Sequence, residues 1–121
     1  RPEFALVEIS ESRLREAISL CNRERELLRE ISLMRKSEPV PVSGKDFVAL
    51  NHGSLLADKK FMVDILESVY NELKKQAVPS DQGPRILLTG STLALGDYRI
   101  LDIIEESGGV VVIEEFAEGI K

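Results

Sequence analysis

Apolar residues recur at helical spacing over residues 11–36, and charged residues occupy the other faces. The apolar positions that fall close to one face are Leu14, Ala17, Ile18, Cys21, Leu28 and Ile31. This pattern predicts an amphipathic helix, and Ser10 or Ser12 could cap its first turn. At a rise of ~1.5 Å per residue the helix is roughly 35–40 Å long. Helices of this length often bridge two larger lobes.

Two further helices are predicted after a proline-containing break at residues 37–44. Residues 43–57 form a short predicted helix followed by a turn near Gly53. Asp58 can cap the next helix, over residues 59–76. Its apolar positions at helical spacing are Phe61, Met62, Ile65, Leu66, Val69, Tyr70 and Leu73.

The last part of the chain has a strand–helix–strand pattern. Residues 85–89 form a short apolar strand, and Asp97 can cap a helix over residues 97–107. Gly108 supplies the left-handed residue that ends this helix. The solid β-branched run at residues 110–113 is typical of a strand that is covered on both faces. Together these segments predict one parallel β-α-β unit with a right-handed crossover.

A polar linker at residues 77–84 divides the chain into two regions. Residues 1–80 form a helical connecting region, and residues 81–121 form the start of a C-terminal α/β lobe. The predicted fold class is α/β: a long helix and a helical hairpin, then one parallel β-α-β unit. Two parallel strands need neighbours, and they need helices on both faces. Because the chain also begins at Arg1 rather than Met, we expect a fragment of a larger doubly wound (Rossmann- or flavodoxin-like) subunit.

Composition and charge narrow the range of partners. The chain has 121 residues, a net charge of -5 and a single cysteine. A negative net charge argues against nucleic-acid binding, which needs a clustered basic face. One cysteine excludes an internal disulfide framework, and no apolar run is long enough to span a bilayer. With no signal-peptide pattern either, we expect a cytoplasmic protein with no membrane or nucleic-acid partner.

The turn after the first predicted strand holds the candidate substrate-binding residues Gly90, Ser91 and Thr92, within TGSTLALGD. Open α/β sheets place their ligands at the carboxyl ends of strands, where a following helix presents free N–H groups. Glycine lets the backbone approach a ligand, and the two hydroxyls can donate hydrogen bonds. The spacing matches neither G-x-G-x-x-G nor a Walker motif. The alternative is an ordinary strand-to-helix turn, and the catalytic residues stay unknown.

The other chemically active residues favour structural roles. Glu114 and Glu115 follow the second predicted strand, where paired acids could act in acid–base chemistry, although acids commonly end strands at the surface. His52 is expected to cap or line a helix end. Cys21 lies on the apolar helix face, and one cysteine with one histidine cannot build a zinc site or hold an iron–sulfur cluster. The simplest interpretation of residues 22–30 is a solvated charged helix face with i,i+4 pairs. The alternative is a face on which a partner docks.

Three stretches follow one another along the chain: LREAISLCNRERELLREISLMRK, PVSGKDF and RILLTGSTLALGDYRILDIIEESGGVVV. Their order resembles the 2-hydroxyacyl-CoA dehydratase family, which includes 2-hydroxyglutaryl-CoA dehydratase and is related to benzoyl-CoA reductase subunits. The residues that fall on the family pattern are Asn22, Arg25, Ser43, Gly44, Gly90, Ser91, Glu105 and Glu106. Two positions depart from it, because Cys21 is not a matched cluster ligand and Thr92 replaces the usual proline after the turn serine.

The resemblance implies a central-to-C-terminal fragment of a D-component-type subunit, whose [4Fe-4S] cluster is bound by cysteines outside this chain. The parent enzyme would remove water from an (R)-2-hydroxyacyl-CoA through a ketyl radical at the thioester carbonyl. Its partners would be the acyl-CoA substrate, a second related subunit and an ATP-dependent iron–sulfur activator. Ser91 would then face the cleft where acyl-CoA and cluster meet.

Three hypotheses for function follow. The first is a fragment of a dehydratase or reductase subunit, with no cofactor of its own and inactive alone. The second is a small module that binds a nucleotide or CoA phosphate at residues 90–92. The third is a helix-mediated interaction domain without catalysis, and a homodimer through the long helix or the edge strand is a related assembly hypothesis. Titration of acyl-CoA or nucleotide against the isolated chain separates them, because only the second predicts clear saturation.

Overall fold

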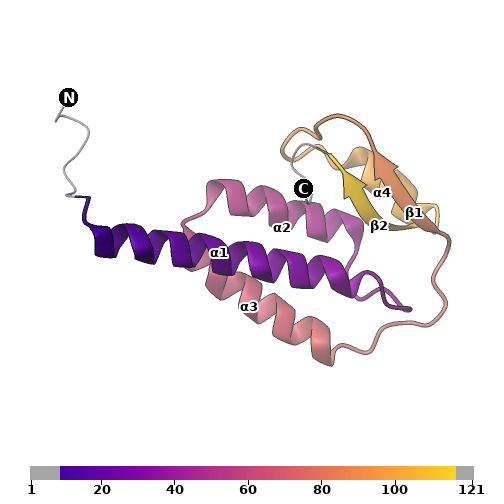
Figure 1. Ribbon diagram of the computed structural model, residues 1–121. Helices are drawn as coiled ribbons and strands as arrows, with labels where there is room; N and C mark the ends of the chain where they lie inside the picture. Colours follow the sequence, from indigo (N-terminus) through magenta and orange to yellow (C-terminus); the bar gives the residue numbers. More distant parts are fainter. Residues whose placement is uncertain (1–8, 117–121) are drawn as a thin grey trace.

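The computed structural model describes residues 9–116, and its helices and strands follow the predicted order. The elements are α1 (Glu11–Met34), α2 (Gly44–Leu56), α3 (Lys59–Lys75), β1 (Arg85–Thr89), α4 (Arg99–Glu106) and β2 (Val110–Glu115). Figure 1 shows the first three helices side by side, with the sheet and α4 at the end where α1 finishes. The observed fold is therefore α/β, with three helices ahead of a parallel β-α-β unit.

The helix starts confirm two of the predicted caps. The Ser10 hydroxyl accepts a hydrogen bond from the backbone N–H of Arg13 at 3.3 Å. The Asp58 carboxylate accepts from the N–H groups of Lys60 and Phe61, at 3.0 and 3.1 Å. Both side chains satisfy donors that have no partner inside the helix.

The predicted turn near Gly53 is wrong, because α2 continues through this residue to Leu56. The backbone N–H of Ala57 still donates to the Gly53 carbonyl at 2.9 Å. Glycine costs about 1 kcal/mol in a helix interior relative to alanine. That cost is small beside the burial of Phe47 and Val48 on the same helix, so packing overrides the local preference.

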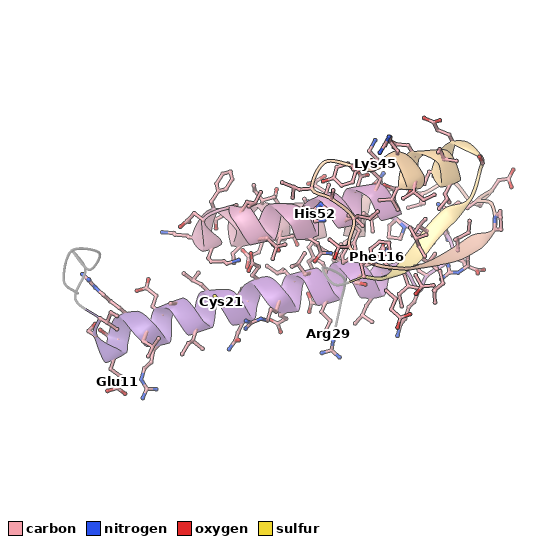
Figure 2. All side chains as sticks on the ribbon, turned by 90° about the horizontal axis from the view of Figure 1, so that it is seen from above. Glu11, Cys21, Arg29, Lys45, His52 and Phe116 are labelled. Atoms are coloured by element: carbon pink, nitrogen blue, oxygen red, sulfur yellow. The ribbon has the colours of Figure 1, made fainter. Side chains whose placement is uncertain are left out.

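The apolar face predicted for α1 is buried only in its second half. Leu27 and Ile31 are fully buried, whereas Leu14 and Ile18 are 52% and 51% exposed. Figures 1 and 2 show why: the Glu11 end of α1 extends beyond the ends of α2 and α3, so nothing in the described chain covers it. The predicted face therefore continues onto an uncovered part of the helix.

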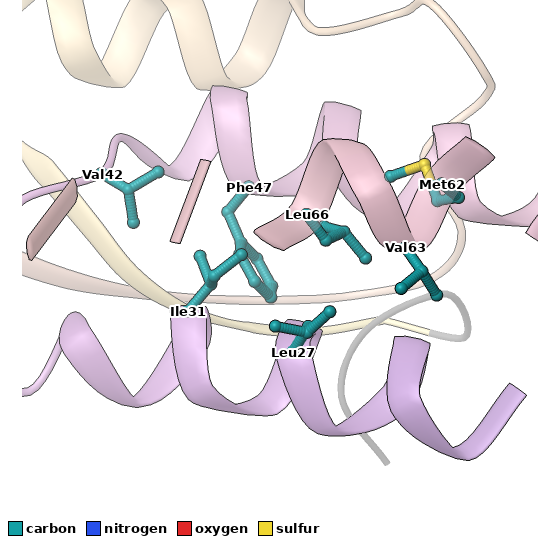
Figure 3. Packing of buried hydrophobic residues seen from close by; sticks show 7 residues of the cluster. All are labelled: Leu27, Ile31, Val42, Phe47, Met62, Val63 and Leu66. Carbon is teal, nitrogen blue, oxygen red and sulfur yellow. The ribbon is translucent and has the colours of Figure 1, made fainter. Parts of the chain in front are cut away.

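The main core lies between α1, α2 and α3. Its buried residues, drawn in Figure 3, are Leu27, Ile31, Val42, Phe47, Met62, Val63 and Leu66. Figure 3 shows Leu27 and Ile31 of α1 pointing toward Phe47 and Leu66. A second, smaller cluster of Val48, Leu101 and Val111 joins α2, α4 and β2. The helical region therefore contains most of the core, and α2 contributes to both clusters.

The charged face predicted for residues 22–30 is wrong at Glu24, which is buried. The Glu24 carboxylate accepts from Lys59 Nζ, and the two oxygens lie 2.8 and 3.1 Å from that nitrogen. Lys59 Nζ also donates to the Ser54 carbonyl at 2.5 Å. This ion pair ties α1 to the start of α3, and a buried carboxylate is tolerated because it is paired.

The two strands are parallel neighbours, and a bulge changes the facing of the second strand. Ile86 pairs with Val111 and Leu87 with Ile113, so Val112 is the extra residue. Beyond the bulge Glu114 lies on the buried face, and β2 runs two residues further than predicted. One extra residue is the usual cause of such a change in facing.

The β-branched run of the second strand is typical of a strand covered on both faces, and residues 9–116 cover one of them. Leu87 and Ile113, which are register partners, are 57% and 49% exposed. The opposite face carries Val111, which packs on α2 and α4.

Gly108 ends α4 with φ +90°, as predicted. Over residues 9–116 no helix combines the length and the apolar content that a membrane crossing needs.

Candidate functional site

The candidate residues Gly90, Ser91 and Thr92 lie at the carboxyl end of β1, and all three are exposed. The backbone N–H of Gly90 donates to the Glu115 carbonyl at 3.4 Å, which continues the strand pairing by one residue. The Thr89 hydroxyl donates to Glu115 Oε2 at 3.1 Å. The start of the loop is therefore held by the end of β2. The side chains of Ser91 and Thr92 are exposed.

Gly90 does not need to be glycine for the fold of this chain. A Cβ atom there would meet Phe116 at 3.8 Å, an ordinary van der Waals distance. The residue in the loop that does need glycine is Gly96, with φ +81°. It follows Leu95 in a tight turn closed by the bond from the Asp97 N–H to the Ala94 carbonyl, at 2.9 Å.

The predicted cap of the helix after the loop is wrong. Tyr98, not Asp97, is the N-cap of α4, and its side chain makes no cap hydrogen bond. The Asp97 carboxylate instead accepts two bonds from the Arg99 guanidinium, both at 2.8 Å. These bonds hold the pKa of Asp97 below its ordinary value of 3.8 and raise that of Arg99. A bidentate arginine outcompetes the backbone N–H groups for this carboxylate.

Glu114 and Glu115 do not form an acidic pair, because they lie on opposite faces of β2. The prediction that both end the strand at the surface is wrong for Glu114. Its side chain and that of Arg35 are 2% and 1% exposed and form an ion pair. Arg35 Nη2 donates to Glu114 Oε2 at 2.9 Å and to the Ser32 hydroxyl at 3.1 Å. Glu115 stays exposed, and its side chain accepts from the Thr89 hydroxyl at the end of β1.

Arg35 is a structural residue that sequence reasoning missed. Its guanidinium carbon lies 3.9 Å from the centre of the Phe47 ring, and its carbonyl accepts from Arg85 Nη2 at 2.8 Å. It therefore connects the end of α1 to α2, β1 and β2. In the sequence it is one of many charged residues near a helix end, and nothing in its neighbours signals a partner 79 residues away.

The prediction that His52 caps or lines a helix end is confirmed for lining, because the imidazole lies against Tyr98, the N-cap residue of α4. His52 lies inside α2 and is 3% exposed. His52 Nδ1 and the Tyr98 hydroxyl share a hydrogen bond of 3.2 Å, and the two rings stack with centroids 5.7 Å apart.

Cys21 is a half-buried free thiol on a different helix, α1, as the labels in Figure 2 show. In residues 9–116 no group of three metal-ligating side chains comes together.

A groove of about 530 Å³ lies between α2 and α3, away from the loop. Its walls are almost entirely apolar, and Phe61, Met62 and Leu50 are among its lining residues. Among the described residues, Asp46 is the one charged side chain on its wall. These residues thus offer a single carboxylate for acid–base or nucleophilic chemistry.

Comparison with known proteins identifies the chain. The model of the family described as 2-hydroxyglutaryl-CoA dehydratase, D-component, matches residues 3–121. The chain belongs to this dehydratase family. It is also 34% identical over 118 residues to YjiM of Escherichia coli (strain K12), a predicted dehydratase subunit. That alignment covers 94% of this chain and 31% of YjiM, so the chain spans about a third of its relative's length.

The family assignment confirms the resemblance drawn from the three sequence stretches. Two of the residues on that family pattern, Gly44 and Glu105, lie where α2 packs against the β-α-β unit. Gly44 starts α2 so close to the sheet that an added Cβ would lie 2.5 Å from Val111 Cβ. Glu105 of α4 accepts from the backbone N–H of Lys45 at 3.2 Å. Both residues therefore serve the joint between the helical region and the β-α-β unit.

Proposed function

We propose that this chain is the central-to-C-terminal part of a dehydratase subunit whose parent enzyme eliminates water from an (R)-2-hydroxyacyl-CoA. The observation that carries the proposal is the family match over residues 3–121 together with a relative about three times as long. The reaction leaves an enoyl-CoA and one water molecule. The proposed partners are the acyl-CoA substrate, a second related subunit and an ATP-dependent activator.

The uncovered surfaces of the chain support a larger parent. A doubly wound fold covers a parallel sheet with helices on both faces. Here one sheet face exposes Leu87 and Ile113, and the free half of α1 exposes Leu14 and Ile18. Apolar patches of this kind are costly to leave in water. In the parent, we expect further strands and helices of the same subunit to cover them.

In the proposed subunit, residues 90–92 bind the acyl-CoA. Ser91 and Thr92 are exposed hydroxyl residues at the carboxyl end of a parallel strand, which is where open α/β sheets bind ligands. Their hydroxyls can donate to the thioester carbonyl or to a phosphate oxygen, and Gly90 leaves room for the ligand to approach the backbone. The role of this loop is to bind and orient the substrate.

The iron–sulfur cluster that the family resemblance implies does not fit the residues of this chain. Such clusters are held mostly by several cysteine thiolates, and the chain has one cysteine, on α1. We therefore place the cluster in the remainder of the parent subunit. The isolated chain should then be inactive.

Substitution of the loop hydroxyls tests the site. In the intact subunit, Ser91→Ala combined with Thr92→Val should weaken binding of 2-hydroxyglutaryl-CoA about 5-fold or more, since each lost hydrogen bond is worth about 0.5–1.5 kcal/mol. Ser80→Ala, at an exposed linker position, is the matched control. Equal affinity in the loop variant and the control would remove the loop from the substrate site.

The source reading frame tests the fragment proposal separately. It should continue on both sides of this chain and encode additional cysteines. An anaerobic iron and sulfide assay of the whole subunit should then find a cluster. A reading frame limited to this chain would instead favour the stand-alone binding module, and saturable binding of CoA by the isolated chain would support that alternative.

A further inference from the structure

The loop that carries Ser91 and Thr92 is joined to the helical region by one side-chain hydrogen bond. The Tyr98 hydroxyl at the end of the loop and Nδ1 of buried His52 on α2 are 3.2 Å apart. The rings are nearly parallel, with an interplanar angle of 26°. His52 is buried and Tyr98 is half-buried. The bond favours one arrangement, because a shifted tyrosine would leave the buried imidazole nitrogen without this partner.

Tyr98 is the residue at which the loop becomes helix. Its carbonyl accepts the first backbone bond of α4, from the Asp102 N–H at 2.9 Å. The other end of the loop is set by the sheet, through the bond from Gly90 to Glu115. In between, Leu93 packs against the second core cluster. The segment that presents the two hydroxyls is therefore defined by an end on the sheet and an end on α2.

The body of α4 is attached to α2 by different contacts. Lys45 Nζ forms an ion pair with Asp102 at 2.6 Å, and the Lys45 backbone N–H donates to Glu105. Leu101 is fully buried against Val48 and Val111. These contacts hold α4 against α2 without the Tyr98 hydroxyl. The hydrogen bond of that hydroxyl therefore mainly fixes the position of the loop.

We propose that His52 and Tyr98 are positioning residues, which fix the end of the 90–98 loop on α2 so that Ser91 and Thr92 are held in one orientation toward the substrate. This inference rests on the proposed function, because it needs the loop to bind acyl-CoA. Neither side chain contacts the substrate in this arrangement. The helical region thereby takes part in substrate binding through the loop.

Hydrogen–deuterium exchange of the intact subunit tests the positioning role. Tyr98→Phe removes only the hydroxyl, and it should speed amide exchange in residues 91–98 roughly three- to tenfold. Tyr70→Phe, on α3, removes a hydroxyl from a tyrosine outside the loop and serves as the control. His52→Asn keeps a polar atom near the Nδ1 position and should leave exchange close to wild type, whereas His52→Leu should resemble Tyr98→Phe.

The same variants are titrated with 2-hydroxyglutaryl-CoA. The proposal expects Tyr98→Phe and His52→Leu to lose several-fold in affinity and His52→Asn to recover most of it. Loop exchange that is unchanged in Tyr98→Phe overturns the positioning role, even if the melting temperature falls. A wild-type subunit that does not bind the ligand overturns the proposed substrate loop instead, so the two failures are distinguishable.

Discussion

The helical region and the β-α-β unit of this chain differ in how they are stabilised. The helices enclose a cluster of seven buried apolar residues, drawn in Figure 3, while the β-α-β unit shares a cluster of three with α2. Within residues 9–116, one face of its sheet leaves Leu87 and Ile113 exposed. A parallel sheet of two strands is too small to build its own core. The helical region therefore supports the β-α-β unit, and α2 and Arg35 make the contacts between them.

The buried ion pair between the two regions should give the largest effect. Glu114→Ala leaves the Arg35 guanidinium buried without its carboxylate, and it should lower the free energy of unfolding by about 3–5 kcal/mol. Urea denaturation of the chain measures this change. The double variant Arg35→Met with Glu114→Leu should regain most of it, because no charge stays buried. A loss below 1 kcal/mol for Glu114→Ala would show that the pair does not join the regions. Glu115→Ala is the exposed control.

Two leucines that are both fully buried compare the cores directly. Leu66→Ala opens a cavity in the seven-residue cluster and should cost about 3–5 kcal/mol. Leu101→Ala lies in the three-residue cluster, whose surroundings can relax into the space, and should cost about 2–3 kcal/mol. The measurement is again the free energy of unfolding in urea. Equal losses at the two sites would mean that the cores are equally well packed.

Two glycines of α2 differ in how closely the β-α-β unit packs against them. At Gly44 an added Cβ would lie 2.5 Å from Val111, so Gly44→Ala should destabilise the chain by about 1–3 kcal/mol as α2 moves away from the sheet. At Gly53 the nearest atoms belong to Met62 and are 3.8 Å away. Gly53→Ala should therefore stabilise the helix by up to about 1 kcal/mol. Thermal unfolding followed by circular dichroism should give shifts of opposite sign, and shifts of the same sign would contradict the close packing at Gly44.

The smallest expected effect concerns Asp97 in the exposed loop. The bonds from Arg99 lower the pKa of Asp97 in the folded chain. A lowered folded pKa contributes stability that is present above the unfolded value, about 3.8, and is lost as the pH falls through the folded value. Asp97→Asn should thus reduce the melting temperature slightly at pH 7, and the difference should shrink as the pH falls below 3.8 and through the lowered pKa of the folded chain. A difference that is independent of pH would assign the effect to something other than this ion pair.

The element order and several boundaries followed from local chemistry. Periodicity placed the helices and both strands, and Ser10, Asp58 and Gly108 have the predicted cap roles. The errors arose where a side chain had a stronger distant or competing partner than the local pattern suggested. Asp97 binds Arg99 instead of capping α4, and Gly53 stays helical because its neighbours are buried.

The family, the α/β order of elements and the loop that is the candidate site therefore follow from the amino-acid sequence alone. Which polar residues are buried depends on contacts between distant parts of the fold. Arg35 and Glu114 are 79 residues apart, and His52 and Tyr98 are 46 apart, so neither pair has a signature in local spacing. The bulge at Val112 alone decides that Glu114 rather than Ile113 faces inward. A strand pattern of period two cannot anticipate an inserted residue, because the change in facing is visible only in the pairing with its neighbour.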